Sequence, residues 1–137
     1  MKTNSISSIM TKNVICVTPD QEILDVKHIY EKEQFHHHIP VVDNERLVGM
    51  VSLIDFMYHI SGAGLKDDHE VYKKLKVRDI MTANPFYLNS DATIEEVAQV
   101  LTEGNYHAVP ILKDQKVVGI VSTADLIKHL LEFLSIA

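Results

Sequence analysis

A short motif that combines a serine with an aspartate occurs twice in the chain. Gly-apolar-Val-Ser-x-x-Asp places Ser52 before Asp55 and, again, Ser122 before Asp125. Because a serine followed three residues later by an acidic residue resembles a capping box, both copies can simply satisfy the free amides at a helix start. The same groups can also hold a ligand, since helix N-termini attract phosphate and a carboxylate accepts hydrogen bonds from ribose hydroxyls. The motif alone leaves a helix cap and a nucleotide site both open.

The motif belongs to an internal repeat that covers most of the chain. Pro40 and Pro110, with their apolar neighbours, align at an offset of 70 residues, and Met10 and Met81 align at an offset of 71. We therefore predict one repeat over residues 7–60, a connector over 61–76 and a second repeat over 77–134. Each repeat is too small to bury a good core alone, so we expect the two to pack on each other.

Both repeats show the same order of periodicities. A short β-prone run, at 14–17 or 86–88, precedes a helix with one apolar stripe, and a hairpin and a second helix follow. In the second repeat the first helix can be capped by Asp91 or Thr93. The sequence therefore predicts an α/β (α+β) chain in which the order β-α-β-β-α occurs twice.

The last helix of each repeat is apolar on more than one side. In the second repeat the apolar positions include Leu126, Ile127, Leu130 and Leu134. A wide core-facing surface would explain them, and so would contact with another molecule. Of the two, we predict a homodimer that uses these helices.

Composition excludes several classes of protein. The 137 residues are 46% hydrophobic and 23% charged, which is ordinary for a globular chain, and the net charge of −6 comes with no basic stripe that would bind nucleic acid. Cys16 is the only cysteine, so no internal disulfide can form and a reducing cytoplasm is the expected location. No apolar run approaches the roughly 18 residues of a membrane helix, so we expect neither export nor membrane insertion.

Taken together, these motifs resemble a known family. Two copies of Ile-Met-Thr, a central Ile/Val-Pro-Val/Ile and Gly-x-Val-Ser-x-x-Asp are similar to the cystathionine-β-synthase (CBS) domain pair, or Bateman module, over nearly the whole chain. The resemblance implies two CBS repeats packed into one pseudo-twofold module that acts as a stand-alone regulator, for example in energy sensing. It also implies that AMP, ADP, ATP or S-adenosylmethionine binds in clefts between the repeats, that no cofactor is required, and that a separate, unknown target protein is controlled.

The resemblance also assigns residues to the ligand. The aspartate of each serine motif would hold the ribose, its serine would lie near the phosphate, and the residues after Met-Thr would contact the adenine. The implied ligand-binding residues are Thr11, Lys12, Asn13, Val14, Ile15, His37, His38, Ile39, Pro40, Ser52, Leu53 and Asp55 in the first repeat, and Thr82, Asn84, Pro85, Phe86, His107, Ala108, Val109, Pro110, Ser122, Thr123 and Asp125 in the second.

The histidines raise a competing hypothesis of a metal site. Residues 36–38 are three consecutive histidines, but neighbouring side chains of an extended segment point to alternate faces, so they do not converge on one ion and we predict no metal. His37 aligns with His107, and in similar proteins this position faces the ligand phosphates. We expect that role for both, with an exposed loop histidine as the alternative, and we assign no role to His28, His59, His69 or His129.

We find no sequence signature of an enzyme. Cys16 has no histidine placed beside it by a known pattern, and the chain lacks a glycine-rich phosphate loop and a Ser-His-Asp context. We therefore expect a binding module without catalysis. The alternative from another class is a ligand-free module for dimerisation or protein interaction, whose serine motifs only cap helices.

Lys12 aligns with Ala83, so the two sites can differ in positive charge.

Overall fold

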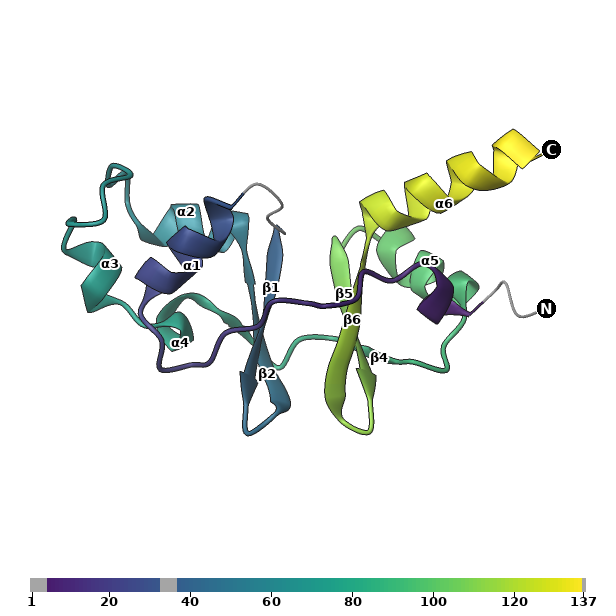
Figure 1. The fold of residues 1–137 in the computed structure, drawn as a ribbon, viewed down its shortest axis with the longest axis horizontal. Helices are drawn as coiled ribbons and strands as arrows, with labels where there is room; N and C mark the ends of the chain where they lie inside the picture. The colour runs from purple at the N-terminus through teal and green to yellow at the C-terminus, as the bar shows by residue number, and fades with distance from the viewer. Residues whose placement is uncertain (1–4, 33–36, 137) are drawn as a thin grey trace. The chain divides into compact units, whose positions relative to one another are not determined.

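The computed structural model describes residues 5–32 and 37–136 and divides the chain into two compact units. The central unit is Ile15–Pro85, and the terminal unit joins Met1–Val14 to Phe86–Ala137 (Figure 1). Each unit therefore contains the beginning of one sequence repeat and the remainder of the other. No helix within the described ranges is long and apolar enough to cross a bilayer.

The central unit is built around a three-stranded sheet in the order β1-β2-β3. Both strand pairs are antiparallel, and Val17 adds an isolated parallel bridge to Val41. The elements are α1 (Ile23–Tyr30), β1 (His38–Asp43), β2 (Arg46–Ser52), α2 (Leu53–His59), α3 (Val71–Lys74), α4 (Val77–Ile80) and β3 (Thr82–Ala83).

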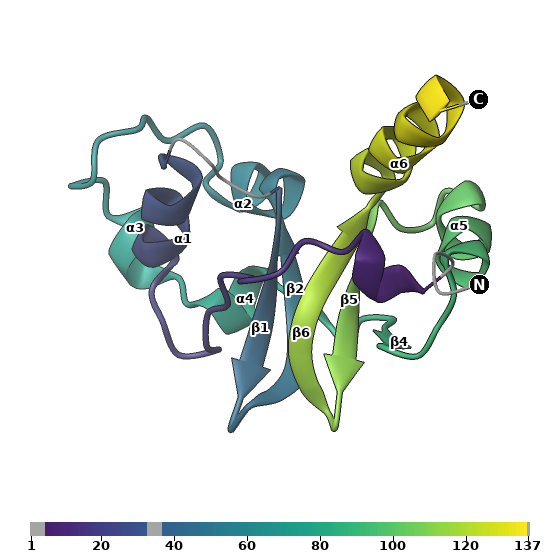
Figure 2. The same cartoon turned by 45° about the vertical axis from the view of Figure 1, so that its right-hand side comes forward.

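The terminal unit has a second three-stranded sheet, in the order β4-β5-β6. Here β4 runs parallel to β5, while β5 and β6 form an antiparallel hairpin that leads directly into α6 (Figure 2). The elements are the 3-10 helix η2 (Ile6–Ser8), β4 (Leu88–Asn89), α5 (Ile94–Thr102), β5 (Ala108–Lys113), β6 (Lys116–Ser122) and α6 (Thr123–Ile136).

The two predicted hairpins are confirmed, and their details repeat. Asn44 and Glu45 have φ values of 51° and 68°, and Asp114 and Gln115 have 51° and 67°. Positive φ at both central residues is the signature of a type I′ turn, whose twist matches that of the flanking strands. Each hairpin also shifts register at the same place, between Val41 and Val42 in one and between Ile111 and Leu112 in the other.

The predicted amphipathic helices are also confirmed. In α1 the side chains of Ile23 and Val26 are fully buried, and in α5 Val97 is fully buried. Of the two candidate caps for α5, Thr93 is the one used: its Oγ1 accepts a hydrogen bond of 3.1 Å from the amide of Glu96, whose carboxylate in turn accepts from the Thr93 amide. This reciprocal pair satisfies two amides at the helix start.

The prediction of strands over 14–17 and 86–88 is wrong in extent. Within these runs, regular pairing is limited to the isolated bridge at Val17 and to Leu88, the first residue of β4. The cause lies just before each run, where Asn13 and Asn84 adopt φ values of 57° and 51°. This left-handed conformation, which asparagine tolerates better than most residues, interrupts the extended backbone.

Each unit depends on a close backbone approach at the motif glycine. In the terminal unit the amide of Thr11 donates to the carbonyl of Ile120 at 2.8 Å, and the amide of Ile120 donates back at 3.0 Å. A Cβ added at Gly119 would lie 3.0 Å from the Thr11 carbonyl and closer still to the sulfur of Met10. The glycine is therefore required where the Met-Thr segment of one repeat crosses the strand of the other.

The central unit repeats this contact with the other copies of the same motifs. Gly49 and Met50 pair with Ala83 and Thr82, and a Cβ at Gly49 would lie 3.1 Å from the Thr82 carbonyl. The pairing explains why glycine and Met-Thr recur together in the sequence. Neither motif is a local structural signal, because each provides the surface on which the other packs.

We expect Gly119→Ala to destabilise the protein by about 1 to 3 kcal/mol, the usual cost of forcing a methyl group into a packed site. The measurement is urea unfolding followed by circular dichroism. Adding Met10→Ala should recover only part of the loss, because the Thr11 carbonyl stays in place. Ser135→Ala, at an exposed position of α6, serves as the control, and a Gly119→Ala variant as stable as that control would contradict the packing argument.

The predicted connector over 61–76 contributes to the central core. Tyr72 in α3 is fully buried, its hydroxyl donates to the carbonyl of Gly64 at 2.6 Å, and its ring stacks on Phe56 with centroids 6.2 Å apart. Lys27, which is only 2% exposed, packs its ammonium 5.5 Å from the Tyr72 ring centroid. The segment therefore packs as a structured part of the central unit.

Asp67 holds the connector to Lys27 and His28 of α1. The Lys27 ammonium lies 2.7 Å from carboxylate oxygens of both Glu31 and Asp67. These hydrogen bonds raise the pKa of Lys27, and the bonds from Lys27 and His28 lower the pKa of Asp67. A buried ammonium requires such partners, because an unpaired charge inside a protein is strongly destabilising.

The lowered pKa of Asp67 predicts a pH-dependent contribution to stability. Its folded pKa lies below the ordinary 3.8, so the contribution is present above that pH and is lost as pH falls through the lowered value. We expect Asp67→Asn to lower the melting temperature near neutral pH, and the difference from wild type to shrink as the pH falls below the ordinary pKa of 3.8. Asp68→Asn, at the exposed neighbour, is the control; a difference that stays constant with pH would contradict this assignment.

Candidate functional site

Both serine motifs form capping boxes. The Ser52 amide donates to Asp55 Oδ2 at 3.0 Å and the Asp55 amide donates to Ser52 Oγ at 3.0 Å, while the corresponding distances for Ser122 and Asp125 are 2.8 and 3.2 Å. The capping role that the sequence left open is therefore present in both units. In the terminal unit the second carboxylate oxygen, Asp125 Oδ1, lies 3.5 Å from Thr11 Oγ1.

An open cavity of about 540 Å³ lies beside this carboxylate in the terminal unit. Its walls come from the N-terminal segment and from one face of α6, and most of its side chains are polar. The volume is within the range of small-molecule sites in proteins. The lining residues are Ser8, Ile9, Met10, Thr11, Asp125, Lys128, His129 and Glu132.

The aligned histidines approach the helix starts through their backbones. The carbonyl of His37 accepts hydrogen bonds from the Leu53 amide at 2.8 Å and from the Tyr30 hydroxyl at 3.3 Å, and the carbonyl of His107 accepts from the Thr123 amide at 3.1 Å. Both imidazole rings are exposed. The backbones of both histidines are thus anchored next to the capping serines, and a phosphate-facing role of the rings stays a prediction. His36 lies outside the described residues.

Each unit brings together predicted site residues from both repeats. The terminal unit combines Thr11 to Val14 of the first repeat with the serine motif of the second, and the central unit combines Thr82 to Pro85 with the serine motif of the first. The division falls between Val14 and Ile15 and between Pro85 and Phe86, so each segment assigned to the adenine is shared between the units.

Some predicted site residues belong to the hydrophobic cores. Ile39 and Val109 are 1% and 0% exposed and pack in the central and terminal clusters, respectively. Pro40, Ala108 and Pro110 are buried as well. These five residues can reach a ligand only through their backbones, whereas Lys12, Asn13 and His107 are exposed.

The sequence prediction missed most of the cavity wall. Lys128, His129 and Glu132 line the cavity together with Asp125. A signal was available, because positions three, four and seven residues after Asp125 lie on the same face of a helix. Ser8 to Met10 were missed because nothing local to that segment shows which strand it pairs with.

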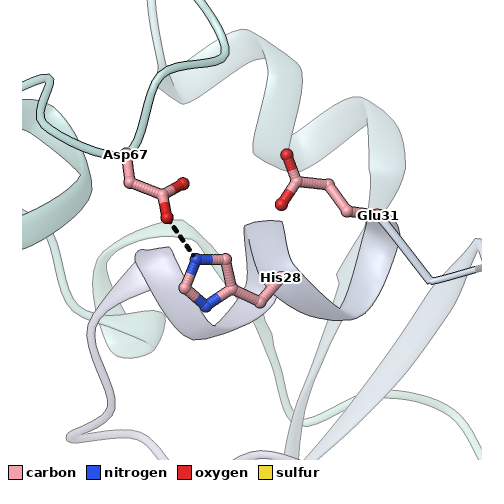
Figure 3. A group of neighbouring side chains, drawn as sticks. All are labelled: His28, Glu31 and Asp67. Atoms are coloured by element: carbon pink, nitrogen blue, oxygen red, sulfur yellow. Dashed lines mark hydrogen bonds and ion pairs between the residues drawn. The ribbon is translucent and has the colours of Figure 1, made fainter.

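The central unit contains a cluster of potential metal ligands whose carboxylates are already paired with a lysine. One ligand atom each of His28, Glu31 and Asp67 lies within 4.8 Å of the others, and His28 Nε2 lies 2.8 Å from Asp67 Oδ2 (Figure 3). The Lys27 ammonium bonds both carboxylates, so an added cation would have to displace a buried lysine. This cluster is best described as the ion-pair network that holds the connector.

Comparison with known proteins identifies the repeats. The family model of the CBS domain matches residues 6–62 and 77–132, which is most of the chain. The chain is 31% identical over 130 residues to the uncharacterized protein MJ0188 of Methanocaldococcus jannaschii. This alignment covers 93% of the chain and 44% of MJ0188, so the chain spans less than half the length of that relative.

Two solved structures carry ligands. The crystal structure of CBSX2 of Arabidopsis thaliana in complex with AMP matches with a TM-score of 0.79 at 25% identity, covering 95% of this chain and 98% of that one. The CBS domain pair of protein MJ0100, in complex with 5′-methylthioadenosine and S-adenosyl-L-methionine, matches with a TM-score of 0.77 at 25% identity, covering 93% and 96%. With two matched copies of the domain, the chain belongs to the CBS domain family.

Proposed function

We propose that the chain is a regulatory module that binds an adenosine-containing ligand at the serine motif of each unit and acts on a separate target protein without catalysis of its own. The observation that carries this proposal is the position of Asp125, at the edge of a cavity of about 540 Å³ with one carboxylate oxygen toward Thr11. The AMP complex of CBSX2 and the complexes of MJ0100 support the class of ligand.

The capping box and the binding role use different atoms of the same carboxylate. Asp125 Oδ2 accepts from the Ser122 amide, while Oδ1 is directed to Thr11 at a long 3.5 Å, a contact that ribose hydroxyls can replace. The cap thus fixes the orientation of a group that then accepts the ribose. The Ser122 hydroxyl and His107 would face the phosphate, and residues 13–14 the adenine.

In the central unit, the equivalent roles fall on Asp55 for the ribose and on Ser52 and His37 for the phosphate. Asp55 makes the same capping box, and the carbonyl of His37 is held to the first residue of α2. Thr82, Asn84 and Pro85 correspond to Thr11, Asn13 and Val14. We propose a second adenosine site of the same design in this unit.

Replacement of the aspartates tests these sites. We expect Asp125→Asn to weaken adenosine-ligand binding in the terminal unit by about 10- to 100-fold, since a hydrogen bond to a charged group contributes roughly 1.5 to 3 kcal/mol. Asparagine retains an oxygen for the Ser122 amide, so stability should change little, whereas Asp125→Ala should also cost about 1 kcal/mol of stability. Isothermal titration calorimetry and thermal unfolding separate the two effects.

Asp91→Asn, at an exposed position of the same unit, is the matched control. If Asp55→Asn, Asp125→Asn and the double variant all bind adenosine ligands as the wild type does, the aspartates are helix caps only. The proposal would then lose its central residues.

A homodimer is a second proposal, supported by the apolar faces of α2 and α6. On α6, Ile127, Leu130, Leu131 and Leu134 are each between 52% and 62% exposed and recur at the spacing of one helical stripe. On α2, Ile54, Met57 and Tyr58 are between 59% and 78% exposed. Contiguous apolar faces of this kind usually mark contacts with another molecule, and we propose that a second copy of this chain covers them.

We expect light scattering to show a dimer at micromolar concentration and a Leu130→Glu, Leu134→Glu double variant to be a folded monomer. Both leucines are exposed, so the charges should not disturb the core. Gln99→Glu, on the exposed face of α5, is the control and should remain dimeric. A wild-type monomer under these conditions would contradict the proposal.

A further inference from the structure

We propose that the two adenosine sites differ in ligand preference, and that the terminal unit takes the more highly phosphorylated ligand, an adenosine di- or triphosphate. This inference rests on the function proposed above and specifies the class of ligand at each site. It follows from residues that differ between the repeats and from the way in which the units interleave.

Several residues around the serine motif differ between the repeats. The first repeat has Lys12 after Met-Thr where the second has Ala83, and the second has Lys128 after its motif aspartate where the first has Tyr58. The residue after the motif serine is Thr123 in the second repeat, where the first repeat has an apolar leucine. Each repeat thus has one lysine at a position where the other repeat has an uncharged residue.

The fold collects both additional lysines in one unit. Lys12 follows Thr11, whose backbone pairs with Ile120 and whose hydroxyl lies 3.5 Å from Asp125 Oδ1. Lys128 lies one turn after Asp125 and lines the same cavity. The interleaving of the repeats therefore assigns both lysines to the terminal unit, where Lys128 lines the cavity and Lys12 follows Thr11, and neither to the central unit.

The central unit carries uncharged groups at the equivalent places. Ala83 is exposed and pairs through its backbone with Gly49, and Tyr58 is 78% exposed. His59, which corresponds to His129 of the cavity, uses its Nδ1 in a 2.8 Å hydrogen bond with the Asp55 carbonyl. The ammonium groups are thus the main electrostatic difference between the two sites.

Two acidic residues, Asp125 and Glu132, also line the terminal cavity. Asp125 has its counterpart in Asp55, so it does not distinguish the sites. Glu132 has none, since Gly62 is at that position, but it lies seven residues along α6 from Asp125, two turns from the helix start. Near the start of α6, Lys12 and Lys128 add positive charge, which each further phosphate of the ligand can use.

The two sites can be measured separately by calorimetry in full-length variants. Asp55→Asn leaves the terminal site and Asp125→Asn leaves the central site, and each is titrated with adenosine, AMP, ADP and ATP without Mg²⁺, at low and high salt. We expect the ratio of ATP to AMP affinity to be about 10-fold higher at the terminal site, and to fall as salt increases.

Reciprocal variants identify the cause. Lys12→Ala and Lys128→Ala should each lower the ATP-to-AMP ratio of the terminal site several-fold, and Ala83→Lys should raise the ratio of the central site. Lys113→Ala, an equal change of charge at the distant hairpin turn, is the control.

Equal ratios at the two sites, or ratios that do not respond to these lysines, would overturn this inference while leaving adenosine binding itself intact. Failure of every titrant, including adenosine, to bind the wild type would instead refute the proposed function, and this inference with it.

Discussion

The contact on which both units depend is the crossing of a Met-Thr segment over a glycine of a neighbouring strand. Met10 and Thr11 lie on Gly119, and Met81 and Thr82 lie on Gly49, at separations that leave no room for a Cβ. Since each crossing joins the start of one repeat to the hairpin of the other, each unit needs residues from both repeats. The same crossing brings Thr11 to Asp125, so the candidate site exists only because the repeats interleave.

The features that could be predicted from the sequence are those determined by neighbouring residues. The hairpins follow from apolar runs separated by four polar residues, as at Asp43-Asn44-Glu45-Arg46, and the caps follow from Ser-x-x-Asp and Thr-x-x-Glu. Internal repetition added to this information, because a pattern seen twice at a constant offset is less ambiguous than one seen once. The candidate site residues Ser122 and Asp125 could be predicted from the sequence for the same reason.

The features that were missed involve residues distant in sequence. Tyr72 lies in a stretch rich in charged residues, and its burial depends on packing against Phe56. Lys27 resembles any exposed lysine of a helix until Asp67, 40 residues later, folds back onto it. Likewise, nothing around Ser8 indicates that it shares a cavity with His129. In each case the burial or position is set by a tertiary contact that local propensity does not encode.

The serine motif shows that a helix cap and a ligand site need not be alternatives. An aspartate at the third helical position must turn one oxygen back to the cap amide, as Asp125 does at 2.8 Å, and this leaves the other oxygen facing outward. A carboxylate held in this way has lost its rotational freedom before any ligand arrives, so a ribose would bind it without a further entropic cost for the side chain. Because folding already orders this group, the cap would favour the proposed binding of a ribose, and the capping and binding interpretations are compatible in one arrangement.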